Sequence, residues 1–195
     1  MKLVIIVGSV REGRFGPSVA SWFAAQAGEH FDLDVLDLAE ISLPSALPSN
    51  AMALRDVTGR PAEMRALAAR LDAADAFVVV TPEYNHSFPA SLKHLIDWHF
   101  TQWQAKPIGF VSYGGHGGGL RSVEQLRLVF AELHAATVRE TVSFDRHWEK
   151  FGADGLLIDA TGPNAAAKVL LDHLAWWAQA LAEARAVRPY EAGAA

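Results

Sequence analysis

Three short segments of the chain concentrate the groups that could do chemistry: residues 8–18, 82–87 and 112–119. The first holds two arginines and two serines among three glycines, just before an apolar stretch with helical spacing. A helix that begins inside such a segment presents unpaired N–H groups and the positive end of its dipole, which suits a phosphate. Arginine adds charge-assisted hydrogen bonds. The segment therefore predicts a phosphate site, and the alternative is a glycine-rich turn with solvated arginines.

The other two segments suit a flat, electron-rich ligand. Residues 82–87, with the sequence PEYNHS, combine an aromatic plane with amide and backbone groups that could bind the edge of a heteroaromatic ring. The alternative is an ordinary loop in which Ser87 caps the next helix and Glu83 is a capping or surface carboxylate. Five glycines within Gly114–Gly119 would let backbone N–H groups approach the same ligand, or would simply make the loop flexible.

Several other chemistries lack their motifs. No GxxxxGK[ST] or GxGxxG pattern is present, and the absence of cysteine excludes disulfides and thiolate catalysis. The stretch His116–Gly119 spells the HGGG of some esterases, but no Gly-x-Ser-x-Gly accompanies it. The eight histidines show no metal-ligand spacing, so we expect no metal site.

The sequence predicts alternating strands and helices, and these elements position the three segments. Short apolar runs predict strands at 3–7, 33–38, 76–81, 108–112 and within 135–143. Helical spacing predicts helices after Gly16, around 64–71, from Pro89, over 120–133 and after Pro163, whereas residues 40–62 predict a long irregular connection. This order predicts one flavodoxin-like domain over residues 1–190. It is a doubly wound, five-stranded parallel sheet of order 2-1-3-4-5 in a three-layer α/β/α arrangement.

That topology gathers the three segments at one edge of the sheet. Parallel strands all end on the same side, and ligands of open α/β sheets bind there, near the point where the strand order reverses. A cluster of Trp98, Phe100 and Trp103 follows a short helix, and it is either buried locally or meets a partner subunit.

Composition bounds the class of protein. The 195 residues are 51% hydrophobic and 20% charged, with a net charge of −5 at pH 7, which indicates a packed globule without the basic surface that nucleic acid requires. No apolar run approaches the roughly 20 residues of a bilayer span, and no secretory signal is present. We therefore expect a cytoplasmic protein without nucleic-acid or membrane partners.

The three segments resemble the NADPH-dependent FMN reductase family, a flavodoxin-like group that includes quinone, azo-dye and metal-ion reductases. The matching stretches are GSVREGR at 8–14, PEYNHSFP at 82–89 continuing to LKHLIDW at 92–98, and SYGG at 112–115. They are ordered and spaced as in the family over residues 1–143. The resemblance implies an FMN-dependent oxidoreductase that takes hydride from NADPH or NADH and reduces a small electron acceptor, namely a quinone, free flavin, azo dye or metal ion. It also implies a homodimer or homotetramer with the helix after Pro89 near the interface.

The resemblance also assigns cofactor-binding residues. The FMN phosphate would be held by Ser9, Arg11, Arg14, Phe15, Gly16, Pro17 and Ser18. The isoalloxazine would be lined by Pro82, Glu83, Tyr84 and Asn85. Its other side would be closed by Ser112, Tyr113, Gly114 and Gly115. Many relatives carry Ser-Phe-Asn where this chain has Arg14-Phe15-Gly16, so the phosphate ligands differ at that turn.

A flavin supplies the redox chemistry itself, so we expect no essential acid or base among the side chains. Backbone donors of Gly114 and Gly115 are expected to face the N1–O2 edge of the ring. Two alternatives remain open. One is a flavodoxin-like electron carrier or regulatory module that binds FMN without NAD(P)H turnover, and the other is a small-molecule hydrolase.

Overall fold

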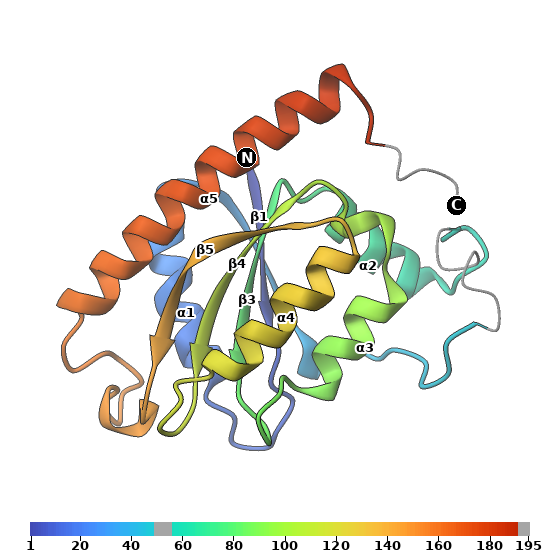
Figure 1. Cartoon of the computed structure of the whole chain (residues 1–195). Helices are drawn as coiled ribbons and strands as arrows, with labels where there is room; N and C mark the ends of the chain where they lie inside the picture. The colour runs from blue at the N-terminus through green and yellow to red at the C-terminus, as the bar shows by residue number, and fades with distance from the viewer. Residues whose placement is uncertain (49–55, 191–195) are drawn as a thin grey trace.

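The computed structural model describes residues 1–48 and 56–190, and these form a five-stranded parallel sheet (Figure 1). The strand order is β2-β1-β3-β4-β5, which confirms the predicted flavodoxin-like topology. The strands are β1 (Lys2–Val7), β2 (Asp32–Asp37), β3 (Ala76–Pro82), β4 (Pro107–Tyr113) and β5 (Ala136–Phe144).

Burial along the strands explains this order. Every residue of β3 and β4 is buried, and so is β1 after its first residue, as expected for central strands covered on both faces. The outer strands β2 and β5 mix exposed and buried positions. Val7 pairs with Val80, and Pro82 pairs with Tyr113, so the loops after β1, β3 and β4 begin side by side.

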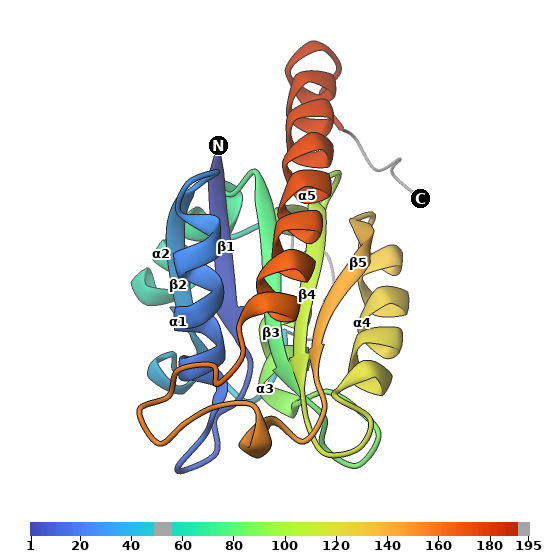
Figure 2. The same cartoon turned by 90° about the vertical axis from the view of Figure 1, so that its left-hand side faces the viewer.

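Helices cover both faces of the sheet (Figure 2). One face carries α1 (Gly16–Ala27) and α5 (Thr161–Val187), and their apolar side chains share one core with β1, β3, β4 and β5. The opposite face carries α2 (Ala62–Asp72), α3 (Ala90–Trp98) and α4 (Leu120–Glu132), which enclose a second core. Three short 3₁₀ helices complete the described elements: η1 (Leu38–Glu40), η3 (Thr101–Trp103) and η4 (His147–Glu149).

The pairing of β5 with β4 is irregular, and a side chain of α4 donates hydrogen bonds to β5 at this place. The register against β4 shifts after the pair Ile108–Thr137. Arg127 donates to the backbone carbonyls of residues 138–139 at 2.6 and 2.8 Å, and its guanidinium carbon lies 5.1 Å from the centre of the Phe110 ring. The arginine therefore supplies hydrogen bonds to carbonyls at the interrupted part of the ladder.

Some expectations from the sequence need adjustment. Helix α5 begins at Thr161, two residues before Pro163, because proline is tolerated in a first helical turn. The irregular connection predicted over 40–62 holds in its described parts up to Arg60, but α2 already begins at Ala62, and residues 49–55 lie outside the described chain.

The tryptophan cluster is buried locally. Trp103 is fully buried and Trp98 is 6% exposed, which agrees with local burial of this cluster.

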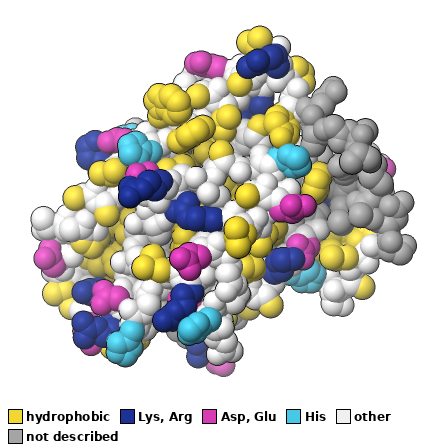
Figure 3. Space-filling model, viewed as in Figure 1, with side chains coloured by type: hydrophobic (Ala, Val, Ile, Leu, Met, Phe, Trp, Pro, Cys, Tyr) yellow, Lys and Arg dark blue, Asp and Glu magenta, His cyan; other side chains and the backbone are white. Residues whose placement is uncertain are grey.

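No helix in the described part of the chain is long and apolar enough to span a bilayer. On the face shown in Figure 3, acidic and basic side chains are interspersed.

Candidate cofactor site

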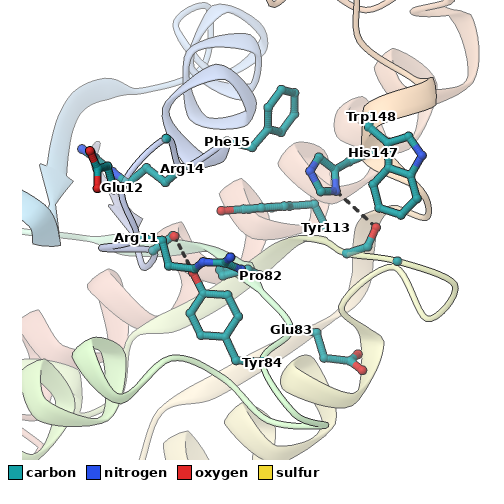
Figure 4. Close-up of a pocket in the computed structure, with 14 residues that line it drawn as sticks. Arg11, Glu12, Arg14, Phe15, Pro82, Glu83, Tyr84, Tyr113, His147 and Trp148 are labelled. Carbon is teal, nitrogen blue, oxygen red and sulfur yellow. Dashed lines mark hydrogen bonds between the residues drawn. The ribbon is translucent and has the colours of Figure 1, made fainter.

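The three segments meet in a cleft of about 350 Å³ at the carboxyl edge of the sheet (Figure 4). This volume lies within the range of small-molecule sites. The lining comes from all three segments and from η4: Ser9, Arg11, Glu12, Gly13, Arg14, Phe15, Pro82, Glu83, Tyr84, Tyr113, Gly114, Gly115, His147 and Trp148.

Arg11 is the exposed cation of the cleft. Its guanidinium carbon lies 5.5 Å from the centre of the Tyr84 ring, and the Tyr84 hydroxyl is 2.7 Å from the Ser9 hydroxyl. The aromatic ring thus supports the guanidinium, and the two hydroxyls tie the first loop to the second. Among the described residues Arg11 makes no ion pair, so its charge is available to an anion in the cleft.

Arg14 is placed differently. Its terminal nitrogen Nη2 forms an ion pair with Asp37 at the end of β2, at 2.5 Å. Asp37 also accepts a hydrogen bond from the Ala39 N–H and so caps η1. The charge of Arg14 is therefore largely neutralised, although its buried Nε has no hydrogen-bond partner within residues 1–48 and 56–190.

The start of α1 provides backbone donors. The N–H groups of Phe15 and Gly16 have no partner among the described residues, as is usual at the beginning of a helix. A Cβ at Gly16 would lie 2.9 Å from Val7 and 3.0 Å from the Tyr113 hydroxyl. Only glycine therefore lets the helix begin this close to the sheet. An anion at this position would meet unpaired N–H groups and the positive end of the helix dipole.

The second loop closes on itself as a tight turn. Tyr84 and Ser87 exchange backbone hydrogen bonds of 2.8 and 3.0 Å, and Asn85 and His86 between them have φ angles of 50° and 66°. This is the arrangement of a type I′ turn. Asn85 is not part of the cleft lining. Ser87 donates to Gln125 and does not cap α3, so the alternative in which it caps that helix does not hold.

Glu83 is held in an ion pair. Its carboxylate accepts from the Arg121 guanidinium at 2.5 Å and from the Arg121 backbone N–H at 3.3 Å, at the start of α4. This matches the alternative of a capping carboxylate. The side chain contributes to the wall of the cleft with its charge compensated.

The third loop uses its polar groups mostly within itself. The Gly114 N–H donates to the Phe144 carbonyl at 3.1 Å, so it is not free to face a ligand, which corrects the expectation of two backbone donors. Ser112 is fully buried and donates to the Gly118 carbonyl, as Ser143 does. Gly118 has a φ of 57°, and a Cβ there would lie 2.3 Å from the Ser143 hydroxyl.

Two cleft residues were missed by the sequence reasoning. His147 and Trp148 belong to η4, after β5. The His147 Nδ1 lies 3.2 Å from the Gly114 carbonyl, and its ring contacts Phe15 and Tyr113 with centroid distances of 4.8 and 5.3 Å. Trp148 is 58% exposed beside this group. The sequence signal was the position of an aromatic pair directly after the last strand.

The structure brings ten of the fifteen residues assigned from the resemblance into the lining of the cleft. Five lie outside that lining: Gly16, Pro17, Ser18, Asn85 and Ser112. Gly16 still begins α1 next to the cleft, and Ser18 is directed toward Gly155. No group of three or more histidine, aspartate or glutamate side chains in the described ranges could hold a metal ion.

The cleft fits a flavin mononucleotide. One end offers the start of α1, Arg11 and a buried Tyr113 hydroxyl that has no partner in the described chain, which suits a phosphate. The wall of the cleft also contains the aromatic side chains of Trp148 and, next to Arg11, of Tyr84, which suit a flat ring.

Fold and cleft together define a flavodoxin-like mononucleotide-binding protein. A sequence profile described as NADPH-dependent FMN reductase matches residues 1–149. The chain belongs to this family, which confirms the resemblance and, at the level of the family, the prediction of an FMN- and NAD(P)H-dependent oxidoreductase.

Individual relatives agree. An NAD(P)H-dependent FMN reductase of Schizosaccharomyces pombe is 38% identical over 121 residues, which cover 60% of this chain and 60% of that protein. A probable NADPH:quinone oxidoreductase of Oryza sativa is 31% identical over 185 residues, covering 88% and 89%. The solved structure of FerB, a flavoenzyme NAD(P)H:(acceptor) oxidoreductase of Paracoccus denitrificans, superposes with a TM-score of 0.72 at 20% identity, over 92% of this chain and 97% of that one, and so shows the shared fold.

Proposed function

We propose that this chain is an NAD(P)H-dependent oxidoreductase that binds FMN in the cleft and passes electrons to a quinone. The observation that carries the proposal is the cleft itself, in which donors suited to a phosphate and aromatic side chains suited to a flat ring line one cavity at the edge of the sheet. When bound, FMN supplies the redox chemistry by accepting hydride from the nicotinamide and delivering the electrons to the acceptor.

The residues of the chain bind FMN and orient its ring. The start of α1 and Arg11 hold the phosphate, and Tyr84 and Pro82 lie along the ring. Because several rigid elements fix these groups, the ring is positioned for nicotinamide and acceptor in turn, and orientation of this kind supplies much of a rate enhancement.

No cleft side chain has to move a proton in this scheme. Glu83 is paired with Arg121, and His147 has one ring nitrogen directed to the Gly114 carbonyl. Because that carbonyl can only accept, Nδ1 carries the hydrogen. Reduction of a quinone to a hydroquinone takes two electrons and two protons. The hydride accounts for the electron pair and one proton, and solvent supplies the second.

A planar aromatic acceptor is favoured by Trp148. Its indole is more than half exposed at the mouth of the cleft, next to Gly115, where a Cβ would lie 3.9 Å from the indole. A quinone could stack against this surface, whereas a metal ion would gain nothing from it. The quinone named for the rice relative supports the same class of acceptor.

The proposal includes a homodimer or homotetramer working in the cytoplasm. Large apolar side chains are exposed on α5, with Trp176 65% and Val169 46% exposed, which supports association with another subunit. Light scattering of the purified chain would test the oligomeric state. Fluorescence localisation of the tagged protein would test the location.

The experiment for the function uses the full chain loaded with FMN. Anaerobic NADPH should bleach the flavin absorbance, and addition of a benzoquinone should restore it with formation of hydroquinone. An FMN-loaded chain that is not bleached by NADPH or NADH would be an electron carrier or regulatory module. A chain that binds no FMN would refute the proposal.

A further inference from the structure

The side chain of Tyr113 ends in a buried hydroxyl without a partner. Tyr113 closes β4 and is 3% exposed, and its ring is held by Phe15 and His147 at centroid distances of 6.1 and 5.3 Å. Within the described chain no group reaches its hydroxyl oxygen at normal hydrogen-bond geometry, although the Ser9 hydroxyl, which is bonded to Tyr84, lies beside it. Buried polar groups in native proteins are nearly always paired, so this hydroxyl is expected to have its partner in a bound molecule.

The hydroxyl points to the phosphate end of the cleft. Figure 4 shows the Tyr113 ring edge-on, with its oxygen directed toward the side of Arg11 and Arg14 and away from Trp148. A Cβ at Gly16 would lie 3.0 Å from this oxygen, which places the hydroxyl beside the first residue of α1. The tyrosine thus reaches from β4 across β3 to the loop after β1.

Arg14, another residue of the cleft lining, also has a buried donor without a partner. The Nε of Arg14 makes no hydrogen bond in the described chain, because the ion pair with Asp37 uses the other end of the guanidinium. The free N–H groups at the start of α1 are further donors near this cleft, and N–H groups can be satisfied only by an acceptor. The oxygens of a phosphate are acceptors of this kind.

We propose that the Tyr113 hydroxyl donates a hydrogen bond to the phosphate of bound FMN, so that Tyr113 selects the phosphorylated flavin. This inference rests on the proposed function. It moves Tyr113 from the ring side of the cofactor, where the family resemblance put it, to the phosphate end.

The environment keeps the hydroxyl in its donating form. Burial raises the pKa of the Tyr113 phenol above its ordinary value, so the group stays protonated beside a negatively charged ligand. A neutral O–H donor next to a phosphate forms a short, charge-assisted hydrogen bond.

The test compares two flavins on two variants. Dissociation constants of FMN and of riboflavin, which lacks the phosphate, are measured by flavin fluorescence for wild type, Tyr113→Phe and Tyr190→Phe. Phenylalanine keeps the ring packing of Tyr113. Tyr190→Phe is the matched control, because it removes a hydroxyl that is bonded to His134 and that lies outside the cleft lining.

Tyr113→Phe should weaken FMN binding about tenfold or more and leave riboflavin binding unchanged. Its thermal midpoint without flavin should not fall, because no hydrogen bond of the free chain is lost. An equal loss for both flavins, or no loss for either, would overturn the inference while leaving the proposed function in place. A wild-type chain that binds neither flavin would refute both.

Discussion

Arg11 offers the sharpest test of how the cleft holds a phosphate. The guanidinium is exposed, stacked on Tyr84 and free of ion pairs in the described chain, whereas Arg14 forms an ion pair with Asp37. Replacing Arg11 by alanine removes a charge-assisted hydrogen bond worth about 1.5–3 kcal/mol, which corresponds to a roughly 10- to 150-fold rise in the FMN dissociation constant. Exposure to solvent puts the expected value toward the lower end of this range.

The assay is titration of FMN and riboflavin against wild type, Arg11→Ala and Arg139→Ala. Arg139→Ala is the control, because it removes the same charge from a side chain that is 93% exposed and outside the cleft. Arg11→Ala should lose affinity for FMN only, and the loss should shrink in high salt, because salt screens an exposed pair. Equal affinities of the Arg11 and Arg139 variants for FMN would refute the assignment of Arg11 to the phosphate.

The remaining predictions concern acceptor, stability and pH. Trp148→Ala should raise KM for a naphthoquinone about 2- to 10-fold and leave turnover with ferricyanide unchanged, since only the flat acceptor stacks, and steady-state kinetics that show equal changes for both acceptors would contradict this. Arg127→Met should lower the free energy of unfolding by about 1–3 kcal/mol in urea titrations, because it leaves carbonyls of β5 without their donor; an unchanged midpoint would be inconsistent with that role. His99 is 1% exposed, and burial lowers its pKa to about 4 from 6.5. Between pH 6.5 and pH 4, His99 therefore binds a proton more readily in the unfolded chain than in the folded one. The free energy of unfolding should fall by up to about 3 kcal/mol as the pH drops from 6.5 to 4. The His99→Gln variant should show a flatter stability curve over that range, and a curve as steep as that of wild type would exclude His99 as the cause.

The sheet could be predicted because its strands are short, apolar and separated by helical periods. Central parallel strands are covered on both faces, so a run such as residues 76–81 contains almost no polar residue. Topology rules then limit the strand order, and parallel strands bring their following loops to one edge. The meeting of the three segments in one cleft followed from these constraints.

The details of the cleft could not be predicted because they depend on partners that are distant in sequence. Nothing local to Arg14 shows that Asp37 neutralises it, and nothing near Gly114 shows that Phe144 accepts its N–H. The same holds for Tyr113, which lies in the third segment but directs its hydroxyl to the first. Pairings across the sheet edge are set by tertiary packing, so residue types alone do not show which polar groups stay free to bind a ligand.

The position of η4 could not be predicted either. Residues 147–149 follow the last strand, and their aromatic pair reaches the cleft because the Arg146 N–H donates to the Gly115 carbonyl at 2.9 Å. A backbone hydrogen bond of this kind does not depend on side-chain type, so neither the composition nor the hydrophobic periodicity of the sequence predicts it. An aromatic pair directly after a strand of a doubly wound sheet is nevertheless a reasonable candidate for a cleft wall.

In the proposed function, one cleft holds FMN by its phosphate and exposes the ring to nicotinamide and acceptor. The most direct measurement is the visible absorption spectrum of the full chain mixed with excess FMN, freed of unbound flavin, and then treated with NADPH without oxygen. We expect about one FMN retained per chain and loss of its absorbance on addition of NADPH. A chain that emerges colourless, or that retains riboflavin as tightly as FMN, would contradict it.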